Sequence, residues 1–349
     1  MSEFSTTSDA EKAAKSQCLI SFGSNLGDRN ELIAEAARKI ASSPLVREFD
    51  GLRTSRLFET PPIGGPGGQD PFLNAIGAFE TDASAREILD LLLELENELG
   101  RQRKQRWSAR SIDLDVVLHG ALVGGDAGLT VPHPRYTARQ FILLPACDVA
   151  PHYRDPRFGW TLKRLTQHLS AGSASLALVG GDQSIRQELC HRLTQEHDLR
   201  TFAERPIVEP LGVVGNAPAP MRRRISDSQT SDSKANIAEP DLQQGLEAGE
   251  PIDVTDNQPW VSAYLPALPP LDSEQTNSSN VPRLVARIQH TTAETQWPAP
   301  HQLWPSGWRW PEYRLEVADM DWAVSEVASA LDSMRCKVTP VTDHGNWWH

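Results

Sequence analysis

The chain has 349 residues, enough for one domain or two, and carries a formal net charge of −12 at pH 7. Such an acidic chain argues against a general nucleic-acid-binding protein, whose surface would be basic. No apolar run approaches the roughly 20 residues needed to cross a membrane, and we expect no signal peptide from the polar N-terminal residues. The four cysteines lie far apart in the sequence, so we expect free thiols and a cytoplasmic protein.

The first half of the chain predicts alternating strands and helices. Residues 1–16 are polar and predict a disordered tail. Further along, the patterns predict strands over 18–22, 53–58 and 72–80, and helices over 29–41 and 84–99. A last strand begins near Ile112. The resulting β-α-β-β-α-β order is the ferredoxin-like motif of an α+β fold.

The second half has a different character. Residues 213–282 are rich in polar residues and proline, which predicts a disordered linker or insert. Residues 175–193 predict a strand, a glycine pair and a helix, as at the start of a P-loop domain, but Ile185 and Arg186 stand where the phosphate-binding Lys and Ser/Thr are needed. We therefore expect a catalytic domain over 17–170 and a degenerate, non-catalytic P-loop-like α/β domain over 171–212 and 283–349. On this division a chain truncated near residue 170 would stay active.

The most informative segment runs from residue 101 to residue 115. Its last residues alternate apolar and acidic side chains, so they predict a strand with Asp113 and Asp115 on one face, about 7 Å apart. Two carboxylates that close repel each other unless a cation lies between them, and their oxygens suit Mg²⁺. The arginines just upstream are of the type that clamps phosphate oxygens. Together these residues indicate phosphoryl transfer, although a lone Asp-x-Asp is more often a solvated strand face.

The same segment carries a family resemblance. Its pattern Gly-Arg-x-Arg-x-x-Arg-Trp-x-x-Arg-x-Ile-Asp-Leu-Asp resembles the signature of 6-hydroxymethyl-7,8-dihydropterin pyrophosphokinases of folate biosynthesis. Three further blocks agree in order, at residues 21–28, 58–74 and 131–141. The resemblance covers about residues 17–165. It implies the ferredoxin-like fold and transfer of the pyrophosphate of ATP to the 6-hydroxymethyl group, with release of AMP.

The resemblance also implies roles for individual residues. Arg101 and Arg110 would be the catalytic residues nearest the transferred group, and Asp113 and Asp115 would hold two Mg²⁺ ions. The residues expected to bind ATP are Glu96, Arg103, Lys104, Arg106, Ile112, His133 and Arg139. A flat pterin needs aromatic faces and amide edges. Its expected contacts are Thr60, Pro61, Pro62, Ile63, Phe72, Asn74, Trp107 and Phe141.

One departure and two alternatives accompany this interpretation. The family usually has Gly-Pro where this chain has Ser108-Ala109, which alters the stiffness of the loop. The chain could be bifunctional, with a second kinase-like activity in its C-terminal region, but the missing phosphate-binding lysine argues against this. It could also be a non-catalytic pterin- or nucleotide-binding regulator whose acidic insert recruits partners. The intact arginines and aspartates of the 101–115 segment argue against that alternative.

Overall fold

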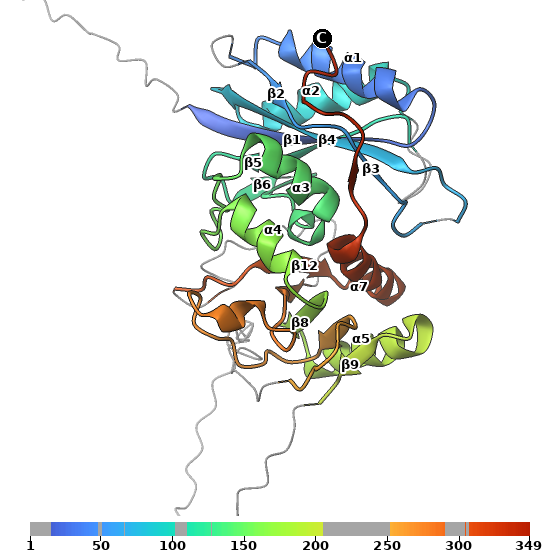
Figure 1. Cartoon of the computed structure of the whole chain (residues 1–349), viewed down its shortest axis with the longest axis vertical. Helices are drawn as coiled ribbons and strands as arrows, with labels where there is room; N and C mark the ends of the chain where they lie inside the picture. Colours follow the sequence, from blue (N-terminus) through green and yellow to red (C-terminus); the bar gives the residue numbers. More distant parts are fainter. Residues whose placement is uncertain are drawn as a thin grey trace, which may run out of the picture.

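The computed structural model describes residues 15–47, 51–65, 67–101, 110–126, 128–204, 252–289, 304 and 307–349. Figure 1 shows two β-sheets at opposite ends of these residues, with α3 (Gln140–Val149) and α4 (Leu162–Ser170) between them. Below, the first unit means the first sheet with α1 to α4, and the second unit means the second sheet with α5 and α7. None of the helices in the described part of the chain is long and apolar enough to span a membrane.

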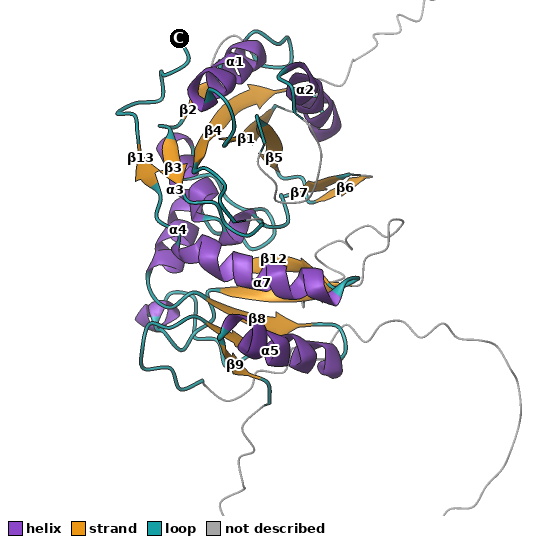
Figure 2. Cartoon of the chain, turned by 90° about the vertical axis from the view of Figure 1, so that its right-hand side faces the viewer, coloured by secondary structure: helices purple, strands orange, loops and turns teal. Residues whose placement is uncertain are grey.

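The first sheet is antiparallel and has the order β13-β3-β4-β1-β5, with β2 paired to β4. Its strands are β1 (Ser16–Ser24), β2 (Arg53–Thr54), β3 (Phe58–Thr60), β4 (Phe72–Thr81), β5 (Asp113–His119) and β13 (Thr339–Pro340). Helices α1 (Arg29–Ala41) and α2 (Ala85–Glu98) cover one face, and α3 lies on the other (Figure 2). The expected β-α-β-β-α-β order is therefore present, although the strand expected over 53–58 is divided into β2 and β3.

Local sequence explains where the two helices begin. Asp28 accepts a hydrogen bond from the backbone of Glu31 and caps α1. Ser84 and Glu87 form a reciprocal capping box at the start of α2. The buried residues of both helices recur at helical spacing and pack on the sheet in one apolar cluster.

The second sheet is parallel and has the order β12-β11-β8-β10-β9. Its strands are β8 (Ser175–Val179), β9 (Arg200–Phe202), β10 (Trp260–Ser262), β11 (Leu284–Gln289) and β12 (Glu312–Glu316). Helix α5 (Gln183–His197) follows β8 and α7 (Met320–Arg335) follows β12. Three short elements before α3 and one before β11 complete the described structure: β6 (Gly124–Asp126), β7 (Leu129–Val131), η1 (Tyr136–Ala138) and η2 (Glu274–Asn277).

The end of the chain returns to the first unit. β13 pairs with β3, and the backbone N–H of Val341 donates to the carbonyl of Leu57 at 2.8 Å. The Trp347 indole lies edge-on to Phe22, with ring centroids 6.3 Å apart, and Trp348 is only 8% exposed in the first unit's core. The expected domain over 283–349 therefore needs correction, because its last residues complete the sheet and core of the first unit.

The expected disordered segments also need correction. Residues 252–282 contain β10 and η2. Ile252, Val254, Trp260 and Tyr264 form a buried apolar cluster there, and this burial offsets the entropy of ordering a polar segment. Ser16 already belongs to β1. The remaining expected disorder, at 1–14 and 213–251, lies outside the described residues.

A shared core joins the two units. The largest buried apolar cluster contains side chains from the first sheet, α3, α4, the second sheet and α7. Beside it, the Arg157 guanidinium contacts Asp155 at 2.6 Å and Glu312 at 2.8 Å, with all three side chains at most 1% exposed. Burial alone raises the pKa of Glu312, but Arg157 and Arg314 outweigh burial and lower it. The contact between the units is therefore both apolar and ionic, which argues against an active chain truncated near residue 170.

Candidate active site

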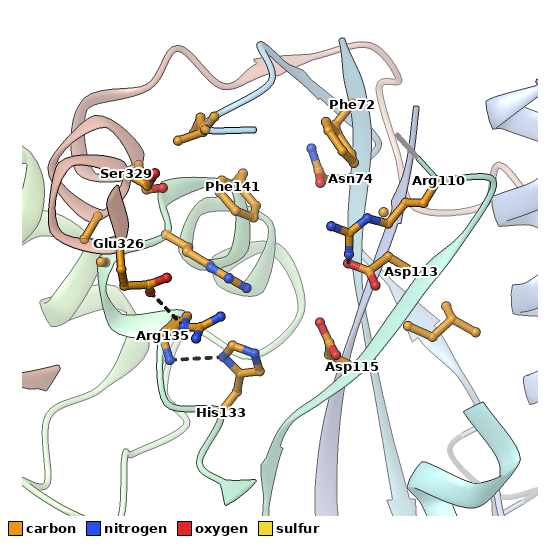
Figure 3. Close-up of a pocket in the computed structure, with 18 of the residues that line it drawn as sticks. Phe72, Asn74, Arg110, Asp113, Asp115, His133, Arg135, Phe141, Glu326 and Ser329 are labelled. Carbon is orange, nitrogen blue, oxygen red and sulfur yellow. Dashed lines mark hydrogen bonds and ion pairs between the residues drawn. The ribbon is translucent and has the colours of Figure 1, made fainter. Parts of the chain in front are cut away.

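A cavity of about 850 Å³ opens between β5 and α7. Figure 3 shows Arg110, Asp113 and Asp115 on one wall, and His133, Arg135 and Glu326 on the facing wall. The cavity collects most of the site residues expected from the sequence: Thr60, Pro61, Ile63, Phe72, Asn74, Glu96, Arg101, Arg110, Asp113, Asp115, His133, Arg139 and Phe141. Residues from four separate stretches of the first unit thus meet helix α7 of the second unit.

The other expected site residues are not brought to this cavity. Pro62 is not among the lining residues. The Ile112 side chain is fully buried in the core under α1 and α2, because it precedes Asp113 and points to the opposite face of the strand. Arg103, Lys104, Arg106 and Trp107 lie outside the described residues, as do Ser108 and Ala109.

The two aspartates lie on one face of β5, as the alternation predicts. The Asp113 carboxylate is 2.9 Å from Arg101 Nη2 and 2.6 Å from Arg110 Nη1. Within the part of the chain that the structure describes, no side chain forms an ion pair or hydrogen bond with Asp115. Two arginines therefore already neutralise Asp113, while Asp115 is open to the cavity.

The two arginines are held by buried polar residues. Glu96 is 1% exposed, pairs with the Arg101 guanidinium and accepts a hydrogen bond from the backbone N–H of Leu114 at 2.8 Å. Asn25 forms two hydrogen bonds with the backbone of Arg110. Its side-chain Oδ1 accepts from the Arg110 N–H at 2.8 Å, and its backbone N–H donates to the Arg110 carbonyl at 3.1 Å. The turn after β1 thus fixes the end of the arginine segment.

Aromatic and amide groups gather at another end of the cavity. Phe72 and Phe141 are both half-buried, and the Arg139 guanidinium lies 5.6 Å from the centre of the Phe141 ring. Asn74 is buried, and its Nδ2 donates to Thr60 Oγ1 at 2.8 Å. A fixed amide between two accessible rings suits a flat heteroaromatic molecule with donors and acceptors along its edge.

Residues 133–139 form a basic segment of the wall facing β5, beside Glu326. The Nδ1 of His133 accepts a hydrogen bond from the backbone N–H of Arg135 at 3.1 Å. Burial lowers the pKa of His133 well below its ordinary value, and Arg139 and Arg135 lower it further. Burial and Arg135 also lower the pKa of Arg139, an effect that Glu326 partly offsets. Because Arg135 and Arg139 repel each other, an anion bound beside them would be stabilised.

Sequence reasoning missed Arg135 and the residues that α7 and β12 bring to the cavity. Arg135 lies inside the 131–141 block, so that block was a signal that could have drawn attention to it. Tyr313, Trp322 and Glu326 also line the cavity, about 180 residues further along the chain. No local pattern could place those three beside Arg135, because the contact depends on how the two sheets pack.

Comparison with known proteins identifies the family of this chain. Residues 19–151 match the family described as 7,8-dihydro-6-hydroxymethylpterin-pyrophosphokinase (HPPK). The 2-amino-4-hydroxy-6-hydroxymethyldihydropteridine pyrophosphokinase of Methylorubrum extorquens is 36% identical over 132 residues, which cover 38% of this chain and 81% of the relative. The chain belongs to the HPPK family. The resemblance expected from the four sequence blocks is thereby confirmed.

Further HPPK relatives agree. The enzyme of the same name from Pseudomonas aeruginosa is 36% identical over 39% of this chain and 82% of its own length. That from Synechocystis is 30% identical over 43% of this chain and 75% of its own length. Among solved structures, Plasmodium falciparum HPPK-DHPS is 12% identical, with 54% of this chain and 56% of that chain covered and a TM-score of 0.36, too low to support an argument. The HPPK family match ends before the second unit begins.

Proposed function

We propose that this HPPK-family chain transfers the pyrophosphate group of ATP to the hydroxymethyl group of 6-hydroxymethyl-7,8-dihydropterin and releases AMP, a step of folate biosynthesis. The observation that carries the proposal is the composition of one cavity. It combines a carboxylate wall at β5, a basic wall at residues 133–139 and an aromatic end with a fixed amide. These three parts suit divalent ions, phosphate groups and a pterin ring, in that order.

The carboxylates fit a magnesium site. Asp115 has no described partner, and carboxylate oxygens are the ligands that Mg²⁺ prefers, so Asp113 and Asp115 would hold the two expected ions. When bound, these ions would neutralise phosphate charge and acidify the attacking hydroxyl group. For Asp113 to serve as a ligand, Arg101 and Arg110 must turn their donors from its carboxylate to phosphate oxygens. The same two arginines would then stabilise the charge that develops on the transferred group.

The aromatic end would hold the pterin. Phe72 and Phe141 would stack on the ring, and the Asn74 amide, held by Thr60, would bind its polar edge. His133 and Arg139 would contact the phosphates of ATP from the basic wall. In this arrangement the protein contributes mainly orientation and charge stabilisation, which are the principal needs of phosphoryl transfer.

For the second unit we propose a degenerate P-loop-like domain that does not bind nucleotide. β8 is its central strand, and Gly180, Gly181 and Asp182 join β8 to α5. The Arg186 side chain is buried under this turn and donates to the carbonyls of Gly180 at 2.7 Å, Gly181 at 2.8 Å and Ala263 at 2.8 Å. These donors bind the protein's own backbone, so they do not supply the fixed cation that a nucleotide phosphate needs.

We place the reaction in a reducing cytoplasm. All four cysteines are free thiols, and Cys18 and Cys190 are fully buried. Burial raises the pKa of the Cys190 thiol to about 12, which keeps it protonated and unreactive. A set of protonated, unpaired thiols fits a compartment where disulfides do not form.

The full-length chain should be incubated with ATP, MgCl₂ and 6-hydroxymethyl-7,8-dihydropterin, and its products separated by ion-exchange chromatography. We expect AMP and pterin pyrophosphate in equal amounts, and no AMP when EDTA replaces MgCl₂ or when the pterin is omitted. A chain that releases no AMP under these conditions contradicts the proposed activity. Calorimetry with a non-hydrolysable ATP analogue should find one site per chain, and a second site would contradict the interpretation of the second unit.

A further inference from the structure

Arg135 is held at one end of its side chain and open at the other. Its Nε lies 2.7 Å from Glu326 Oε1, and its guanidinium carbon lies 5.3 Å from the centre of the Trp322 ring. The Arg135 side chain is 24% exposed and lines the cavity, whereas that of Glu326 is only 5% exposed. Among the described residues, none accepts a hydrogen bond from the terminal nitrogens Nη1 and Nη2. Two donor groups are therefore available to a molecule in the cavity.

The residues that hold Arg135 all belong to the second unit. Glu326 and Trp322 lie on α7, and Tyr313 of β12 donates its hydroxyl hydrogen to the same Glu326 oxygen. Burial and the Glu326 carboxylate raise the pKa of Tyr313, so this hydroxyl remains a donor at neutral pH. Arg135 thus lies within the HPPK match, whereas its three holders lie beyond the end of that match.

We propose that the second unit prepares Arg135 as an additional phosphate-binding residue for ATP, with Glu326 as the positioning residue. This inference rests on the proposed function, because it assigns the bound anion to the triphosphate. A guanidinium with two free terminal nitrogens binds phosphate oxygens in a fixed, bidentate geometry. Because Glu326 and Trp322 already fix the side chain, less conformational freedom is lost when the phosphate arrives.

The position of Arg135 favours the triphosphate over the pterin. Figure 3 shows Arg135 next to His133, on the wall opposite Asp113 and Asp115. Phe72 and Asn74 lie in another part of the cavity. A phosphate chain whose ions are held at β5 would therefore present its free oxygens to the wall that contains Arg135.

The test compares four variants of the full-length chain with the wild type: Glu326→Gln, Arg135→Gln, their double variant and Arg135→Lys. The matched control is Asp332→Asn, which removes one charge from the same helix at a half-exposed pair with Arg335. For each we would measure the KM for ATP and for the pterin from AMP release, the affinity for a non-hydrolysable ATP analogue by calorimetry, and the melting temperature.

We expect Glu326→Gln and Arg135→Gln each to weaken ATP binding on the order of tenfold, the effect of one charge-assisted hydrogen bond. The KM for the pterin should change less than twofold, and the double variant should match Arg135→Gln alone because Glu326 acts through Arg135. Arg135→Lys should fold, because the position is partly exposed. It should weaken ATP binding by the same factor, because lysine has no donor at the Nε position to pair with Glu326. The Asp332→Asn control should match the wild type.

Three results would overturn the inference: unchanged ATP affinity in Glu326→Gln, an additive loss in the double variant, or an equal rise in both KM values. Failure of the proposed function gives a different pattern. In that case the wild type releases no AMP, yet the calorimetric loss of ATP-analogue affinity in the Arg135 and Glu326 variants would still appear.

Discussion

The cavity and the second sheet use arginine in opposite ways. Arg110 and Arg135 keep 21% and 24% of their side-chain surface exposed at the cavity. Arg186 and Arg283 in the second unit are buried and donate to backbone carbonyls. Burial also lowers the pKa of Arg283 to about 10. The number of arginines in a segment therefore does not identify an anion site; what differs is whether the guanidinium lines a cavity or is buried against backbone carbonyls.

The two units also differ in the structural elements that each contributes to the other. The HPPK match lies within the first unit, yet the first sheet takes its edge strand β13 from the end of the chain, and the cavity takes one wall from α7. We interpret these contacts as structural support that the second unit gives to the first.

Deletion of residues 339–349 tests this support most directly. We expect a loss of about 5 kcal/mol or more in the free energy of unfolding, because truncating one buried tryptophan alone costs roughly 3–5 kcal/mol. Urea unfolding gives the value, with the exposed Asn346→Ala as control. Gly345→Ala should reproduce part of the loss, because an added Cβ would lie 1.9 Å from the Thr54 carbonyl oxygen. A deleted chain as stable as the wild type would show that the tail is not part of the first sheet.

Glu312→Gln tests the ionic contact between the units. The substitution removes the Glu312 carboxylate from Arg314 and leaves Arg157 with Asp155, and removing one partner of a buried ion pair typically costs about 3–5 kcal/mol of stability. Glu196→Gln breaks a pair with Arg192 at the surface and should cost much less stability, because solvent screens such a pair. Similar unfolding free energies for the two variants would contradict an interface held by the buried network.

Asp113→Ala and Asp115→Ala compare the carboxylate that is paired with arginines with the carboxylate that is open to the cavity. Both should reduce AMP release at least about a hundredfold, a typical loss for a group that stabilises the transition state. The two variants should differ in stability: Asp115→Ala should leave it unchanged or slightly higher, whereas Asp113→Ala should lower it because Arg110 loses its ion pair and Arg101 loses one of its two carboxylate contacts. Activity within tenfold of the wild type in either variant would exclude its metal role.

Lowering the pH should reduce the stability of the protein, because His168 is neutral in the folded core. Burial, with a further contribution from Arg283, lowers the pKa of His168 to about 3. Below pH 6.5 the unfolded chain binds a proton at this residue and the folded chain does not, so stability falls as the pH drops from 6.5 toward 3. Between pH 7 and pH 5 the loss is roughly 2 kcal/mol for this residue. Urea unfolding at the two pH values checks it, and His168→Gln should remove that part of the difference.

His133 provides the comparison at the cavity. Burial, Arg139 and Arg135 lower its pKa in the free chain, so its contribution to the pH dependence has the same sign as that of His168. An ATP analogue should raise the pKa of His133 because it adds negative charge to this wall, and it should leave His168 unchanged. NMR titration of the two imidazoles separates them. An unchanged His133 pKa in the complex would contradict an anion at the basic wall.

Local patterns predicted the local structure well. Apolar spacing gave α1 its observed bounds, and the alternation at 112–115 placed Asp113 and Asp115 on one strand face. Helix spacing and strand alternation reflect contacts with the nearest layer, so they can be identified within a few residues. The family resemblance then placed most of the expected site residues in the cavity, because those residues recur at fixed places in four short blocks.

Contacts between distant segments could not be predicted in this way. Nothing near Thr339 indicates that it pairs with Glu59, and nothing near Glu326 indicates that it reaches Arg135. The partners of Asp113 were missed for a related reason. Arg110 lies only three residues away, but its direction depends on how Asn25 fixes the backbone of the arginine segment.

The pairing of β3 with β13 also has a consequence during synthesis. Strand β3 ends at Thr60 and its partner begins at Thr339. At a translation rate of about 5–20 residues per second, roughly 15–55 seconds pass before that partner leaves the ribosome. During this time the edge of β3, with the start of the cavity's Thr-Pro-Pro loop beside it, exposes unpaired backbone groups that could bind another chain's strand. Nascent chains of this protein should therefore need a chaperone at that edge until the last residues are made.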